Sequence, residues 1–187
     1  MVKLTHLAAI REFTRRRVSY YEFTPEINVW VFVWLPKGGK LGYTSMFIGR
    51  MNNDSCYVSW RANTGGVVLL HKYPAAVADG YDTDYSLEHR EPDFIYGLKS
   101  LNTPAMKHAW RDICTKKERP SFNLISKNGS TIVKQILKAG LVNSHLRSKV
   151  SEVLGSNFYM TTPMVIISAC NIMRDNMMGT QIIMSEQ

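Results

Sequence analysis

The chain has 187 residues, of which 45% are hydrophobic and 20% are charged. This length favours one domain with a core large enough to need no disulfide or metal, and this composition excludes a disordered or low-complexity chain. Lys and Arg number 23 against 15 Asp and Glu, a net charge of +8, so an anionic partner such as nucleic acid, acidic lipid or acidic protein is expected without a choice among them.

Cysteine usage and hydropathy indicate a cytoplasmic protein. Cys56, Cys114 and Cys170 match no zinc spacing and leave an odd thiol, which favours a reducing compartment. The N-terminus lacks the pattern of a secretory signal peptide, and the apolar run 29–35 is too short to cross a membrane. The five histidines have no ligand spacing. We therefore expect no metal, no other cofactor and no membrane span.

Residues 1–23 are predicted to form a helical extension, because apolar side chains recur at nearly helical spacing from Leu4 to Phe13. Basic residues cluster at the end of this segment and again further along the chain: Arg15, Arg16, Arg17, Lys116 and Lys117. Such clusters usually form solvated helix ends. The alternative is a patch that binds the phosphates of a nucleic acid.

Three runs rich in β-branched and aromatic residues predict an antiparallel meander over residues 27–61. Residues 62–91 lose periodicity, so an irregular excursion with one short strand near 67–73 is expected there. A further strand is predicted at 93–98.

Capping signals predict three helices in the second half of the chain. Pro104 follows two candidate N-cap residues and predicts a helix to residue 116. A second helix is predicted from about Gly129 to Gly140, and a third begins at Pro163. The sequence thus predicts an α+β domain, in which a small antiparallel sheet packs on helices.

Six segments occur in an order that resembles one superfamily. They are "LGYTSMFIGR" (41–50), "YVSWR" (57–61), "EPDFIYGLKSLN" (91–102), "AWRDI" (109–113), "FNLISKNGSTIVKQILKAGL" (122–141) and "TTPMVIISACNIMR" (161–174). The order is similar to that of circularly permuted papain-like proteins, which include NlpC-type amidases, lecithin:retinol acyltransferase relatives and Rho-inactivation-type toxin domains. The resemblance implies a permuted papain-like core over 27–175 within a single domain, 1–187.

In that superfamily a cysteine at a helix start is activated by the helix dipole and by a histidine on a neighbouring strand. The resemblance places the cysteine position on Gly129 and the histidine position on Tyr43. Glycine offers no nucleophile, and a phenol with a pKa near ~10 is a poor base at neutral pH. Asp93 is either the remnant of the orienting third residue or a turn aspartate.

The loss of both reactive residues predicts a non-catalytic pseudoenzyme, used for assembly or binding as a viral, mobile-element or toxin-derived module. Its binding residues are expected at the vacant site: Asn128, Ser130, Thr131 and Trp60. A protein partner or self-assembly is expected. One alternative is a residual amidase or acyltransferase that uses Ser130 as a substitute nucleophile, although helix capping is the simpler role for this serine. The other alternative is a basic nucleic-acid-binding protein.

Overall fold

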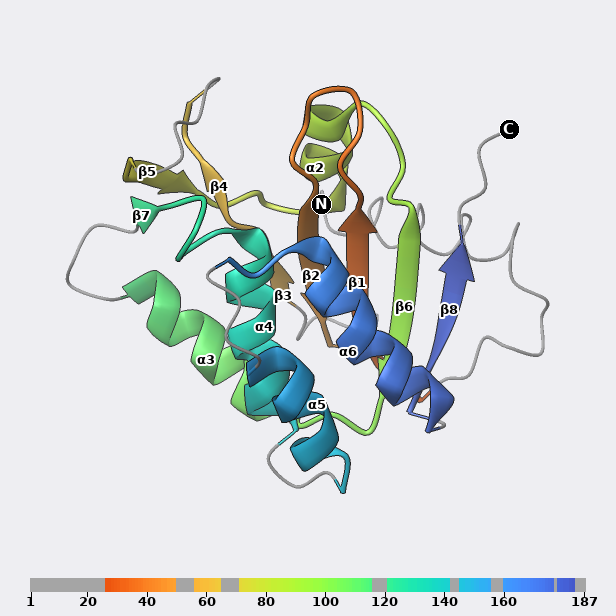
Figure 1. Ribbon diagram of the computed structural model, residues 1–187. Coiled ribbons are helices and arrows are strands. Elements are labelled where there is room, and N and C mark those ends of the chain that lie inside the picture. Colours follow the sequence, from red (N-terminus) through yellow and green to blue (C-terminus); the bar gives the residue numbers. More distant parts are fainter. Residues whose placement is uncertain are drawn as a thin grey trace.

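The computed structural model describes residues 26–49, 56–64, 71–115, 121–141, 145–155, 160–176 and 178–183. The expected N-terminal helix and the basic residues Arg15, Arg16, Arg17, Lys116 and Lys117 lie outside these ranges. The described residues form an α+β fold, as the sequence predicts (Figure 1). None of the helices among them is both long and apolar enough to cross a bilayer.

A five-stranded antiparallel sheet forms the centre of the fold. Its strand order is β3 (Cys56–Val58), β2 (Tyr43–Ile48), β1 (Ile27–Trp34), β6 (Phe94–Lys99) and β8 (Gly179–Ile183). The predicted meander is confirmed, because β1 pairs with β2 and β2 pairs with β3, both antiparallel. Strand β8 was not predicted.

Strand β1 separates two cores. Its valines, Val29, Val31 and Val33, point to one face and join the larger core. Its aromatic residues alternate with them, since Trp30 and Phe32 belong to a second, mainly aromatic core on the other face. The two-residue period of a strand therefore sorts branched and aromatic side chains to opposite faces of the sheet, and both faces are covered.

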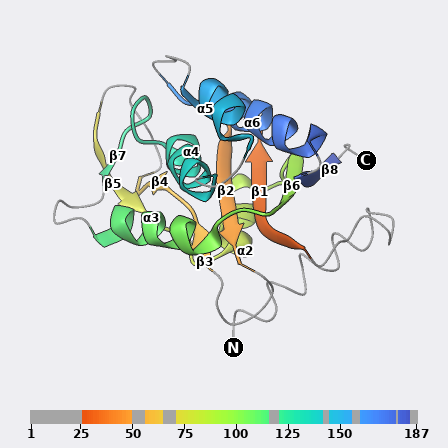
Figure 2. The same cartoon turned by 90° about the horizontal axis from the view of Figure 1, so that it is seen from below.

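Helices cover the two faces unequally (Figures 1 and 2). The valine face carries α4 (Gly129–Gly140) and α6 (Pro163–Asp175), flanked by α3 (Thr103–Thr115) and α5 (Arg147–Gly155). The aromatic face carries α2 (Tyr81–Glu88), whose Tyr81 lies 4.9 Å from Phe32 between ring centroids. The three predicted helices α3, α4 and α6 are confirmed, each beginning within one residue of the expected start.

The stretch 62–91 is more regular than expected. It holds β5 (Tyr73–Ala76) and the helix α2, and the prediction of an irregular excursion is wrong there. Strand β5 lies between β4 (Arg61–Ala62) and β7 (Ser121–Phe122) in a small second sheet. The apolar pattern of α2 is weak because two of its buried residues are carboxylates, Asp84 and Glu88, so periodicity could not reveal this helix.

Candidate functional site

The start of α4 is fixed by its N-cap residue, Asn128. The side-chain oxygen of Asn128 accepts a hydrogen bond from the Thr131 amide at 2.9 Å, and its nitrogen donates to the carbonyls of Leu124 (2.7 Å) and Thr161 (3.0 Å). Such a cap satisfies one of the free amides of the first helical turn. Asn128 and Thr131, both expected to bind a ligand, are thus engaged in joining α4 to the segment before α6.

Gly129 packs directly against β2. A Cβ atom at this position would lie 2.7 Å from Cε2 of Tyr43 and 2.9 Å from the carbonyl oxygen of Thr44. The second of these atoms belongs to the backbone, so this contact would remain even if the Tyr43 side chain rotated away. The structure therefore brings the two replaced positions, Gly129 and Tyr43, into contact, and glycine is the residue that permits it.

Ser130 is buried beside this contact, with 4% of its surface exposed. Its hydroxyl oxygen accepts a hydrogen bond from Thr44 Oγ1 at 3.0 Å. A serine nucleophile needs an adjacent base to take its proton, and a threonine hydroxyl cannot serve as one. Ser130 lies in the first turn of α4 next to Gly129, and its described hydrogen-bond partner gives it no activation.

The phenol of Tyr43 belongs to a chain of hydrogen bonds with a defined direction. Ser59 donates to Asp84 Oδ1 at 3.1 Å, so its oxygen is left to accept from the Tyr43 hydroxyl at 2.7 Å. The Tyr43 oxygen in turn accepts from the Trp60 amide at 3.1 Å. This phenol is accordingly a donor toward Ser59, and its ring closes the space above Gly129.

Asp84 is the centre of the polar cluster behind Tyr43. The carboxylate is fully buried and also accepts hydrogen bonds from Tyr57 (2.8 Å) and Arg61 Nε (2.8 Å). Arg61 donates a second hydrogen bond to Glu88 at 2.7 Å and stacks 3.4 Å above the Tyr43 ring. A buried carboxylate is tolerated only when it is paired and hydrogen-bonded, and this cluster meets both conditions.

Burial controls the ionisation of the cluster. The pKa of Tyr43 is raised, first by burial and then by the negative charge of Asp84, and the same two causes raise the pKa of Tyr57. Burial alone would lower the pKa of Arg61, but interactions with Tyr43 and Asp84 outweigh it and raise that pKa. Both phenols therefore stay neutral and Arg61 stays charged at physiological pH.

Asp93 lies apart from this cluster, at the start of β6. Its carboxylate accepts a hydrogen bond from the Leu35 amide at 2.6 Å and pairs with Arg90 at 2.7 Å, while its own amide donates to the Val33 carbonyl. These contacts fix the turn that leads into β6. The residue hydrogen-bonded to the Tyr43 hydroxyl is Ser59, not Asp93.

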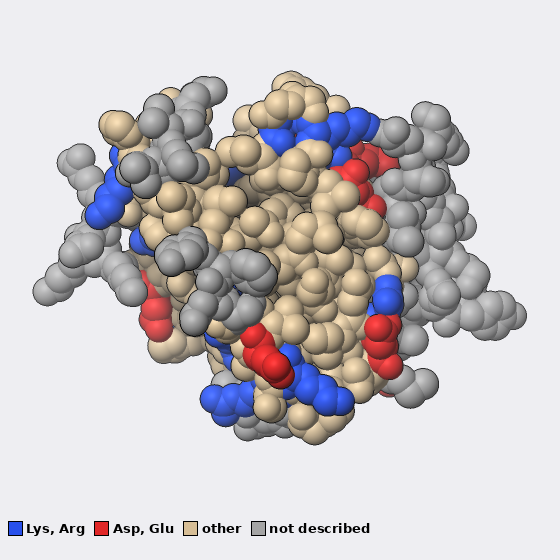
Figure 3. Space-filling view, viewed as in Figure 1, with Lys and Arg blue, Asp and Glu red and all other residues tan. Residues whose placement is uncertain are grey.

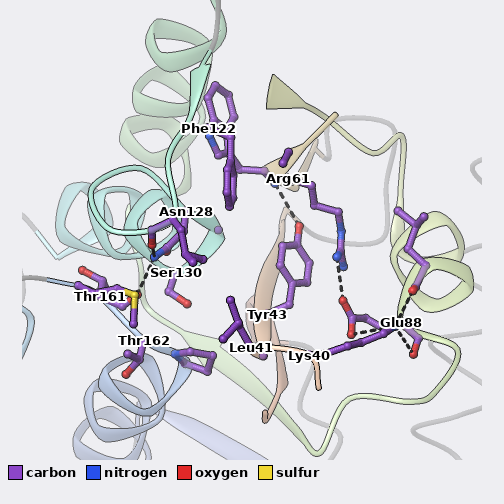
Figure 4. Close-up of a pocket in the computed structure, with 18 of the residues that line it drawn as sticks. Lys40, Leu41, Tyr43, Arg61, Glu88, Phe122, Asn128, Ser130, Thr161 and Thr162 are labelled. Atoms are coloured by element: carbon purple, nitrogen blue, oxygen red, sulfur yellow. Dashed lines mark hydrogen bonds and ion pairs between the residues drawn. The ribbon is translucent and has the colours of Figure 1, made fainter. Parts of the chain in front are cut away.

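A cavity of about 560 Å³ opens at this site (Figure 4). Gly129, Tyr43 and Ser130 lie in its wall together with Trp60, which is fully buried. The rest of the lining comes from the β1–β2 loop, the end of α2, the loop before α4 and the segment before α6: Gly39, Lys40, Leu41, Gly42, Arg61, Ala62, Thr64, Leu87, Glu88, Phe122, Leu124, Asn128, Met160, Thr161, Thr162 and Pro163. Among the described residues of this lining there is no histidine and no cysteine, and the one carboxylate among them, Glu88, pairs with Arg61 and Lys40.

The cluster around Asp84 was missed at the level of sequence, although a signal for it exists. In "YVSWR" the residues Tyr57, Ser59 and Arg61 occur at every second position, as expected for one face of a strand. All three hydrogen-bond to Asp84. Three polar residues in alternation within an apolar sheet require a buried partner, and that requirement could have directed attention to the acidic stretch before β6.

Comparisons of the chain with protein-family models, with curated proteins and with solved structures found no match. Within the described ranges, no group of three or more His, Cys, Asp or Glu residues is arranged to hold a metal ion. The function must therefore be argued from the geometry of the site.

The contact between α4 and β2 predicts that Gly129→Ala destabilises the fold, although alanine favours helices over glycine. We expect a loss of about 1–3 kcal/mol in the free energy of unfolding, typical of overpacking, as measured by urea denaturation. Gly155→Ala is the matched control, because a Cβ there meets only Lys138 Nζ at 3.9 Å. Gly129→Ala should cost less in a Tyr43→Ala background. An unchanged or increased stability of Gly129→Ala would contradict the contact.

The raised pKa of Tyr43 predicts a loss of stability at alkaline pH. Above pH ~10 the unfolded chain loses a phenolic proton that the native state retains, so the free energy of unfolding must fall as pH rises. Tyr43→Phe should lower stability at pH 7, because the Trp60 amide loses its acceptor, yet it should make the alkaline decline shallower. Urea unfolding across this pH range tests both effects. An alkaline decline as steep in Tyr43→Phe as in the parent would contradict this account.

Proposed function

We propose that the chain is a non-catalytic pseudoenzyme with a circularly permuted papain-like fold, which acts as a binding or assembly protein. The observation that carries the proposal is the contact between Gly129 and Tyr43, which lie at the two positions that would hold a catalytic cysteine and histidine. These positions are 86 residues apart in sequence, as are Thr44 and Ser130, which are hydrogen-bonded beside them. Their meeting is what a permuted papain-like site requires.

The chemistry of the site supports a non-catalytic role. Gly129 supplies no thiol, and the raised pKa of Tyr43 keeps its phenol neutral, so it cannot take a proton at neutral pH. The ring also occupies the space next to Gly129 in which a nucleophile would meet a substrate. The wall that remains has the mixture of apolar and hydroxyl groups typical of a binding pocket.

An amidase or acyltransferase acting through Ser130 is the principal alternative. It would need a base within hydrogen-bond reach, and the described partner of the Ser130 hydroxyl is Thr44. A nucleic-acid-binding role receives no support from the cavity either, because Lys40 and Arg61 are paired there with Glu88 and Asp84. The non-catalytic role is therefore the one we favour.

A fluorophosphonate probe distinguishes the pseudoenzyme from a serine enzyme. The purified chain should show no labelling above that of its Ser130→Ala variant, because no base activates the hydroxyl. Mass spectrometry of the peptide that contains residue 130 measures the modification directly. Labelling at Ser130 that disappears in Ser130→Ala would show a functional nucleophile and overturn the proposal.

The papain-like assignment has a separate test in the variant Gly129→Cys with Tyr43→His. If the two positions correspond to the superfamily's reactive pair, its crystal structure should place the new thiol within hydrogen-bond reach of the imidazole. A small shift of α4 is expected, because the Thr44 carbonyl crowds the new Cβ. Gly129→Cys alone is the control, and its thiol should react more slowly with iodoacetamide at pH 7. A thiol and imidazole held apart in the double variant would refute the assignment.

A further inference from the structure

We propose that copies of this chain associate head to tail, with the acidic, apolar surface around α2 of one copy docking on the basic helices α3, α4 and α5 of the next. This inference rests on the proposed assembly role and specifies the partner as a second copy of the chain. Two surfaces on opposite faces of the sheet carry it: one is apolar and acidic, and the other is basic.

The first surface, called the α2 surface, exposes large hydrophobic side chains. Four of the five that are exposed in the described part of the chain are Leu41 (61%), Val77 (46%), Tyr85 (44%) and Leu87 (51%). They lie on α2 or on segments beside it. Leu41 belongs to the loop between β1 and β2, and Lys40 of the same loop binds it to α2 by donating a hydrogen bond to the Leu87 carbonyl at 2.8 Å. Leu41 and Leu87 also line the cavity of the candidate site, and exposed apolar side chains beside such a cavity mark an interaction site.

Acidic residues surround this apolar group. The segments that carry these side chains, 36–41 and 76–93, contain six acidic and three basic residues, a net charge of −3 within a chain of +8. Two of the basic residues are Lys37 and Lys40, on the loop that holds Leu41. Asp84 and Glu88 are buried and paired with Arg61, and Asp93 pairs with Arg90. The acidic side chains that remain exposed are Asp79, Asp82 and Glu91. They complete the α2 surface as defined here.

The second surface is basic. The described residues of 103–155, which form α3, α4 and α5 and the segments between them, include seven basic and two acidic residues, a net charge of +5. Arg111, Arg147 and Lys149 are exposed on α3 and α5. The pKa of Lys134 is lowered by burial and then by the nearby charge of Lys138, so cations are crowded on α4 as well. Figure 3 shows lysine and arginine side chains gathered around the lower end of the molecule, where α5 lies in the same view of Figure 1.

Charge complementarity selects a second copy as the partner. At physiological salt, charges interact over about 8 Å, so the facing patches determine the interaction more than the net charge of +8 does. A polyanion could bind the basic helices, but it would leave the exposed leucines of the α2 surface uncovered. A second copy satisfies both surfaces at once. Because α2 and α4 lie on opposite faces of the sheet (Figure 2), the contact is heterologous and builds a ring or a filament.

Sedimentation velocity of the full chain, treated with nuclease, tests this inference. We expect oligomers that grow with protein concentration and dissociate as salt is raised, because screening weakens the contact between the patches. A monomer at every concentration in low salt would overturn the inference. Association that occurs only when DNA or RNA is added would also overturn it, since the basic helices would then serve a polyanion.

Charge reversal identifies the two surfaces. Asp79→Lys with Glu91→Lys, and separately Arg111→Glu with Lys149→Glu, should each weaken association at least about tenfold. An equimolar mixture of the two variants should restore assembly, because every reversed surface then meets a reversed partner. Failure of the mixture to assemble would contradict the proposed pairing.

The apolar contribution has its own pair of variants. Leu87→Ser should weaken association, whereas Met164→Ser, which alters an exposed side chain on α6, should leave it unchanged. Equal effects of the two substitutions on association would contradict the role of the α2 surface in the contact. These outcomes are independent of Ser130 labelling: a monomer that lacks a nucleophile would refute the assembly and keep the pseudoenzyme, whereas a labelled oligomer would do the reverse.

Discussion

The close approach of α4 to β2 is the constraint on which the site depends. It requires Gly129, because any side chain there would collide with the Tyr43 ring and with the backbone of Thr44. The close packing against β2 is therefore a structural reason for a glycine at position 129, separate from the absence of a thiol there. In this geometry the absence of a nucleophile and the tight packing of helix on strand both follow from a glycine at position 129, and the Tyr43 ring fills the space beside it.

A second constraint follows from Tyr43. Its buried phenol needs hydrogen-bond partners, and it obtains them from Ser59 and the Trp60 amide. Ser59 leads to Asp84, a fully buried carboxylate that needs Arg61 in turn. The polar cluster thereby joins β2 and β3 to α2 through the aromatic face of the sheet. Tyr43 is in this way tied to α2, the helix that carries the proposed docking surface.

Much of the fold could be predicted from the sequence. The meander, β6 and the helices α3, α4 and α6 have strong local signals, such as the Pro104 and Pro163 starts and the alternation in β1. Helix α2 and strand β8 lack such signals. The former is held by long-range polar contacts through Asp84, and the latter by pairing with β6 across more than 80 residues. Local patterns cannot report contacts of that range.

The site was predictable in part. The resemblance led to Gly129, Tyr43 and Ser130, which the structure brings together. It did not lead to Ser59 or Asp84, because serine and aspartate are common surface residues and only the fold shows that both are buried here.

The central claim is that the Tyr43 ring lies against Gly129 and leaves no room for a catalytic group. A nuclear Overhauser measurement between the Gly129 α-protons and the Tyr43 ring protons tests it most directly. We predict strong cross-peaks and ring-current-shifted α-protons. The absence of these cross-peaks, with ordinary glycine shifts, would show an open space between the helix and the strand and would contradict the account.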